Sequence, residues 1–142
     1  MKRLLFIFAA FVLAAGLAAV GSAVIAKAPK SSTIMIRHQM RGCHTWSVNG
    51  GAYRATQSTS LARGGTITFM NMDVMPHKLL KTSGPAIHVA GKPNMNHMNA
   101  SVKVTFAKTG VYKFTTKPGE DYMKGMKTIG EDNVLRLTVK VS

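Results

Sequence analysis

The stretch around His77 contains residues whose types could carry chemistry. Pro76 fixes the backbone immediately before this histidine, and Met72 and Met75 lie within the same predicted turn. Thioether sulfur is a soft ligand and imidazole binds most transition metals, so a rigid loop of this composition can present its donors to a soft metal. The alternative is a loop histidine that only hydrogen-bonds to a neighbour. His77 by itself leaves both interpretations open.

Methionine recurs in pairs along the chain. Ten of the 142 residues are methionine. Three Met-x-x-Met pairs fall in predicted loops, namely Met72/Met75, Met95/Met98 and Met123/Met126, and His97 lies beside Met98. Thioethers combined with one or two histidines suit Cu(I), although methionine also fills irregular gaps in cores. We accept the core role for Met35, Met40 and Met70, and we expect no ligand role for His38 and His88.

Short strand-like runs separated by turn signals must position these residues. The expected strands are 33–37, 41–48, 53–61, 65–70, 77–80, 101–106, 111–116 and 134–141. Asn49-Gly50 between two extended runs indicates a hairpin turn, because both residues tolerate positive φ. No long segment after residue 26 has a helical period. The pattern predicts an all-β sandwich or small barrel.

The first 26 residues have the composition of an export segment. Lys2 and Arg3 are basic, and residues 4–26 carry no charge. This pattern is typical of a signal peptide or, if it is not cleaved, of a membrane anchor. Residues 27–32 form an expected tether, and residues 33–142 an expected single domain. We therefore expect a periplasmic or otherwise extracytoplasmic protein, secreted or held to a membrane only through its N-terminal segment.

The sequence is strongly basic, with a formal net charge of +14. Four of the five acidic residues lie beyond Gly119, so the preceding part of the domain is almost free of carboxylates. Because the basic residues are scattered and the chain is expected to be exported, we do not expect nucleic-acid binding. The charge could steer an acidic partner protein or an anionic membrane. It also suits life at low pH, where few carboxylates can lose their charge.

Two segments resemble the cupredoxin (blue copper protein) family. Gly65–His77 combines an alternating apolar strand and Asn71 with a Pro-His ending, and Val102–Phe114 contains the later Phe-x-x-x-Gly-x-Tyr pattern. The resemblance covers residues 48–142, and the pieces occur in the family's order. It implies a Greek-key β-sandwich with metal ligands at one end, and copper as the cofactor.

This chain has a matching residue at some of the family's ligand positions and a different residue at others. His77 falls on the family's first histidine ligand. Thr116 occupies the position of the family's cysteine ligand, and residues 119–120 stand where its second histidine would be. Met123 and Met126 remain as candidates for the loop methionine. The thiolate sulfur of a copper site would therefore have to come from a cysteine elsewhere in the chain.

Cys43, the only cysteine, is the candidate for that sulfur, and His44 follows it directly. A lone thiol in an exported domain is free, paired with another molecule, or bound to a metal. A thiolate, two imidazoles (His44 and His77) and a distant thioether form a blue-copper ligand set. Adjacent residues of a flat strand point to opposite faces, so joint ligation requires a bend, which Gly42 permits. The alternatives are a small buried cysteine and a hydrogen-bonded strand histidine.

We expect an exported copper-binding protein that transfers single electrons to a redox partner protein, acts as a monomer and is not an enzyme. The expected ligands are His77, Cys43 and His44, with Met126 or Met123 as the weak axial thioether. One alternative is a copper-handling or copper-tolerance protein that binds Cu(I) through His77, His97 and paired methionines such as Met98. Another is a metal-free interaction module. The sequence contains no evident acid–base pair or nucleophile arrangement for hydrolysis.

Overall fold

The computed structural model describes residues 27–38, 44–118 and 135–142. The expected export segment, Cys43, Met123 and Met126 lie outside these residues. Across the described ranges there are ten strands and no helix, and hence no helix that could span a membrane. The strands are β1 (Ser31–His38), β2 (His44–Val48), β3 (Thr56–Leu61), β4 (Thr66–Asn71), β5 (His77–Ser83), β6 (His88–Ala90), β7 (Asn94–Met95), β8 (Ser101–Thr105), β9 (Gly110–Pro118) and β10 (Arg136–Val141).

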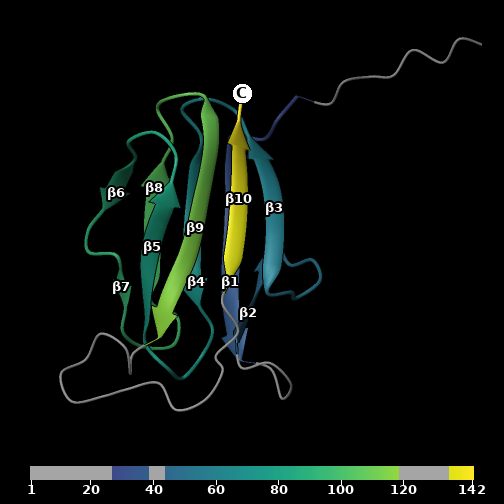
Figure 1. Cartoon of the computed structure of the whole chain (residues 1–142). Helices are drawn as coiled ribbons and strands as arrows, with labels where there is room; N and C mark the ends of the chain where they lie inside the picture. Colours follow the sequence, from purple (N-terminus) through teal and green to yellow (C-terminus); the bar gives the residue numbers. More distant parts are fainter. Residues whose placement is uncertain (1–26, 39–43, 119–134) are drawn as a thin grey trace, which may run out of the picture.

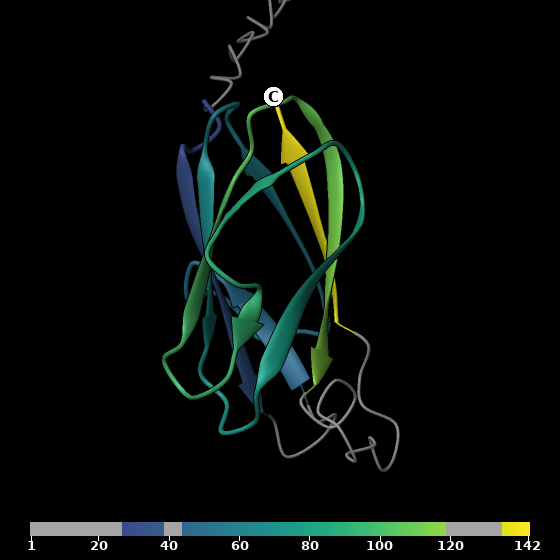
Figure 2. The same ribbon diagram turned by 90° about the vertical axis from the view of Figure 1, so that its left-hand side faces the viewer.

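The strands form two five-stranded sheets that lie face to face, which confirms the expected all-β sandwich (Figures 1 and 2). The first sheet has the order β2-β1-β4-β8-β6, and the second has the order β3-β10-β9-β5-β7. Each sheet contains one parallel pair, β1–β4 in the first and β3–β10 in the second, and its other pairs are antiparallel. The chain repeatedly crosses between the sheets, so loops gather at both ends.

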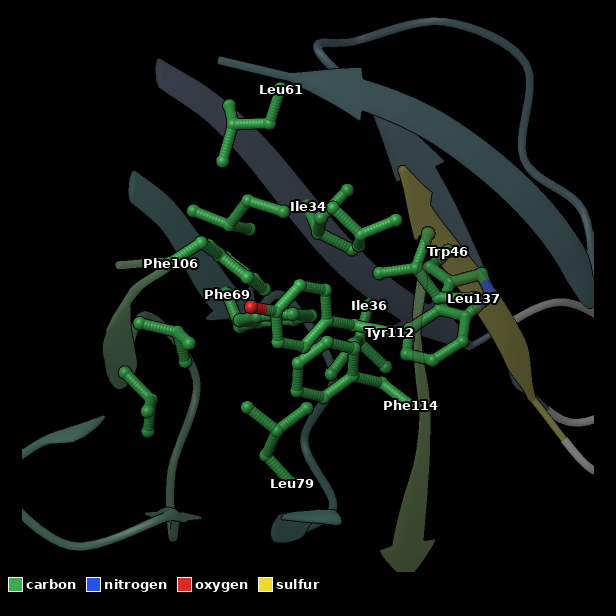
Figure 3. Close-up of a cluster of buried hydrophobic side chains, with 14 of the residues drawn as sticks. Ile34, Ile36, Trp46, Leu61, Phe69, Leu79, Phe106, Tyr112, Phe114 and Leu137 are labelled. Carbon is green, nitrogen blue, oxygen red and sulfur yellow. The ribbon is translucent and has the colours of Figure 1, made fainter. Parts of the chain in front are cut away.

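One apolar core fills the space between the sheets (Figure 3). Along β8 and β10, apolar residues alternate with polar ones, and the apolar residues are the buried ones. Aromatic rings meet at the centre, with centroids 4.9 Å apart for Phe106 and Tyr112 and 5.4 Å apart for Phe69 and Phe114. Because burying a large apolar side chain contributes roughly 1.5–3 kcal/mol, this core holds the two sheets at a fixed separation.

The Asn49-Gly50 turn forms as predicted, with φ angles of 50° and 77°. The expected hairpin is limited to a single antiparallel bridge between Trp46 and Arg54, since β3 then joins the second sheet and pairs with β10. The Asn49 side chain accepts hydrogen bonds from the backbone N–H of Thr33 (2.7 Å) and the hydroxyl of Ser32 (2.9 Å). These bonds tie the turn to β1, and the following segment then passes along the edge of the sandwich to β3 in the second sheet.

The two ends of the sandwich differ in what they contain. At one end, the carbonyls of Pro29 and Lys30 accept hydrogen bonds from the backbone of Ala62 and Thr66, so part of the expected tether packs on the domain. At the other end, lower in Figure 1, β1 and β4 finish and β2 and β5 begin. The chain therefore brings four strand ends from both sheets together there.

Candidate metal centre

Asn71 organises the loop that connects β4 to β5. Its side chain is fully buried; the amide nitrogen donates to the carbonyls of Met75 (2.7 Å) and Met95 (3.2 Å). Its amide oxygen accepts from the backbone N–H of Asp73 at 2.8 Å. These bonds cross from the loop to β7, while Pro76 restricts the backbone before His77. The loop therefore has a defined shape, and this shape directs Asp73 inward.

Asp73 is a buried carboxylate in contact with two imidazoles. Its Oδ2 lies 3.2 Å from Nε2 of His44 and 3.2 Å from Nε2 of His77. Its Oδ1 accepts from the backbone N–H of Met75 at 3.2 Å. All three charged or ionisable side chains are buried, so the carboxylate meets the imidazoles rather than water. We call Asp73, His44 and His77 the Asp73 cluster.

The two histidines of the cluster come from different sheets. His44 begins β2 and His77 begins β5, and their rings are nearly perpendicular with centroids 4.7 Å apart. Each occupies the core-facing register of its strand, since Trp46 and Leu79 follow two residues later and are buried. His77 is held on both sides, because β5 pairs with β7 and β9.

His38 lies next to the cluster, although we expected no ligand role for it. It is the register partner of His44 in the β1–β2 pair, and the ring centroids are 5.8 Å apart. Ligand atoms of His38, His44 and Asp73 all lie within 4.8 Å of one another. His38 is exposed, whereas the other two are buried. It therefore lies between the cluster and the solvent. Its ring contacts a buried histidine of the cluster, so it is more than a surface histidine.

A cavity of about 370 Å³ opens beside His38. The residues that line it are Arg37, His38, Met72, Asp73, Val74 and Met98. Two predicted candidates, Met72 and Met98, thus lie around the same hollow as the carboxylate of the cluster. We call this hollow the outer cavity.

The remaining predicted site residues are placed differently. His97 is exposed, and its Nδ1–H donates to the carbonyl of Met98 at 2.9 Å. Met95, predicted in a loop, instead belongs to β7 and is buried in the core. Cys43, Met123 and Met126 fall outside the described residues, so their ligand roles stay predictions. Of the predicted histidines, His44 and His77 are the two that the fold brings together.

Each Asp73–histidine pair of the cluster has the spacing of two ligands of one metal ion. A nitrogen and an oxygen bonded to one ion at about 2.0–2.1 Å lie about 2.9 Å apart at a right angle and about 3.3 Å apart at a tetrahedral angle. Both separations from Asp73 Oδ2 are 3.2 Å, within that span. Imidazole and carboxylate donors suit divalent copper, nickel or zinc. Without a metal, the same 3.2 Å separations are at the long end of a hydrogen bond.

The Asn71→Ala substitution tests whether the amide shapes the site. It leaves the carbonyls of Met75 and Met95 and the buried N–H of Asp73 without this partner, so we expect a loss of at least about 2 kcal/mol in the free energy of unfolding. Denaturant unfolding measures the loss. Asn96→Ala, at an exposed position in the neighbouring loop, is the control and should cost less than about 0.5 kcal/mol. Equal effects of the two substitutions would contradict the organising role of Asn71.

No protein-family model matches the sequence, and no curated protein matches it. Solved structures resemble it at low sequence identity. A purple cupredoxin from Nitrosopumilus maritimus is 19% identical with a TM-score of 0.46, over 78% of this chain and 99% of that chain. A reduced amicyanin mutant is 15% identical with a TM-score of 0.44, over 78% and 82%. A cysteine protease inhibitor from Entamoeba histolytica is 8% identical with a TM-score of 0.42, over 80% and 99%.

Cupredoxins are thus among the solved structures that this chain resembles. At TM-scores below 0.5 these similarities carry no argument about the site. The chemistry of the site follows from the residues of this chain.

Proposed function

We propose that this chain is an exported, cupredoxin-like protein that binds one copper ion at the Asp73 cluster and carries single electrons. The observation that supports this most directly is the position of Asp73 Oδ2, which is 3.2 Å from both His44 Nε2 and His77 Nε2. These buried donors are the ligands that we propose for the ion. The chain then acts as a carrier rather than as an enzyme.

Rigidity of the ligands supports an electron-transfer role. His77 is fixed by strand pairs on both sides, and His44 is fixed by its pairing with β1. Bound copper would supply the one-electron change between Cu(I) and Cu(II). Residues that move little during such a change keep its reorganisation energy low. Cys43, the direct neighbour of His44, is the proposed source of thiolate sulfur, and Met126 or Met123 the proposed axial thioether.

A second candidate function is copper handling, and the outer cavity favours it. Met72 and Met98 line this cavity together with His38, and thioethers prefer Cu(I). In this function the protein would bind and release Cu(I) without a copper–thiolate bond. Its copper ligands would not need the fixed geometry that an electron carrier needs. His97 is then a further candidate ligand at the edge of the same segment.

Our proposals for the cellular compartment and for the partner protein rest on the sequence. The basic start and the long uncharged run support export, to the periplasm or a similar compartment. The net charge of +14 supports electrostatic attraction to an acidic redox partner.

Copper titration of the full chain tests the proposal. We expect the wild type to bind a single copper ion, and His77→Ala to weaken binding by at least about tenfold because a buried imidazole is lost. Competition against a chelator of known affinity measures this, and circular dichroism checks that each variant folds. His88→Ala, at an exposed position on β6, is the matched control. A wild type that binds no copper, or equal binding by both variants, would overturn the proposal.

The Cys43→Ser substitution separates the two candidate functions. A thiolate bond to Cu(II) gives intense visible absorption, so for an electron carrier we expect a coloured wild type and a colourless variant. For copper handling we expect a colourless Cu(II) protein and the same Cu(I) affinity in both chains. Absorption spectra of the Cu(II) forms and Cu(I) competition titrations measure the two outcomes.

A further inference from the structure

Three segments that are distant in sequence meet at the outer cavity. His38 ends β1, Met72 follows β4, and Met98 precedes β8. Hydrogen bonds hold these segments together: the N–H of Met72 donates to the carbonyl of Ile36 at 2.8 Å, and the N–H of Asn99 donates to the carbonyl of Asn71 at 2.6 Å. These bonds hold the three segments together at this end of the sandwich.

The donors around the cavity suit a soft monovalent ion. Two thioethers and one imidazole are neutral ligands of the kind that Cu(I) prefers. The charged groups of the lining are Arg37 and Asp73, which offset each other, so an ion with a single positive charge meets less repulsion than a divalent one. The Arg37 guanidinium also lies over the ring of Tyr53, 5.7 Å from its centroid.

The outer cavity and the Asp73 cluster share one donor, Asp73. Asp73 lines the cavity and touches His44 and His77, and ligand atoms of His38, His44 and Asp73 lie within 4.8 Å of one another. An ion held by His38 and the thioethers could therefore exchange these ligands for His44 and His77 one at a time while Asp73 stays bound. Exposure falls along this path, since Met98 is 45% exposed, Met72 is half-buried and His77 is fully buried.

We infer that His38, Met72 and Met98 form a transit site through which Cu(I) enters and leaves the Asp73 cluster. This inference rests on the proposed copper function and adds a route to it. A single exposed methionine on a protein surface needs no explanation. Two methionines and a histidine around one hollow that has a buried carboxylate in its wall form a donor set.

Copper loading separates a transit site from a set of permanent ligands. Cu(I) is offered to the apo-protein as a coloured chelator complex, and stopped-flow absorbance follows its transfer. For His38→Ala and for the double variant Met72→Leu/Met98→Leu, we expect loading to slow by about tenfold or more, the size of effect seen for outer-shell partners of metals. The affinity at equilibrium should stay the same within the error of the titration, because the Asp73 cluster is intact. His88→Ala and Met35→Leu are the matched controls.

Each other outcome overturns the transit site. An affinity that falls in proportion to the loss of His38 or the thioethers would make them permanent ligands. Unchanged loading in every variant would make the cavity irrelevant to copper. A wild type that takes up no Cu(I) at all would overturn the proposed function as well, which the titration of His77→Ala detects separately.

Silver provides a direct view of the ligands. Ag(I) is soft, has the same charge as Cu(I) and does not change its oxidation state under these conditions. In the folded wild type with ¹³C-labelled methionine methyl groups, substoichiometric Ag(I) should shift the signals of Met72 and Met98 and leave that of Met35 in place. The Met72→Leu and Met98→Leu variants assign the two signals. Absence of a shift at both methyl groups would contradict thioether binding in the outer cavity.

Discussion

The buried charge of Asp73 is the constraint on which this end of the molecule depends. A carboxylate removed from water destabilises the fold by several kcal/mol unless it is paired or hydrogen-bonded. Here both oxygens have partners: Oδ2 faces the imidazoles of His44 and His77, and Oδ1 accepts from Met75. Asp73 lies in the connection from the first sheet to the second, and its imidazole partners begin one strand in each sheet. Satisfying this one charge therefore ties the two sheets together beyond the apolar core.

The sandwich contributes positions rather than chemistry. Its core fixes the distance between the sheets, and the alternation of each strand decides which side chains turn inward. His38, His44 and His77 occupy the core-facing register of β1, β2 and β5 at the strand ends where the apolar filling stops. His44 and His77 are buried at these positions, whereas His38 is exposed to solvent. This arrangement produces a graded path from an exposed imidazole to a buried one.

The sequence carried enough information for the sandwich and for part of the site. Alternation and turn residues predicted every long strand, while the two-residue β7 has only Asn94 and Met95 to signal it. His44 and His77 were recognisable as candidates, but their contact depends on how the chain crosses between sheets, which local patterns do not encode. Asp73 lies within the turn predicted before His77, and it is the only acid before Glu120 in a chain of net charge +14. His38 continues the Ile34, Ile36 alternation, which places it on the inner face.

The scarcity of carboxylates makes the fold and the site respond differently to acid. Asp73 is the only acidic side chain among residues 27–38, 44–118 and 135–142, so every ion pair with an acidic side chain within these ranges must involve it. Protonation therefore removes few stabilising interactions from the sandwich itself, whose sheets are held by backbone pairing and apolar contacts. The Asp73 cluster has no such independence, because protons compete with a metal for imidazole and carboxylate alike.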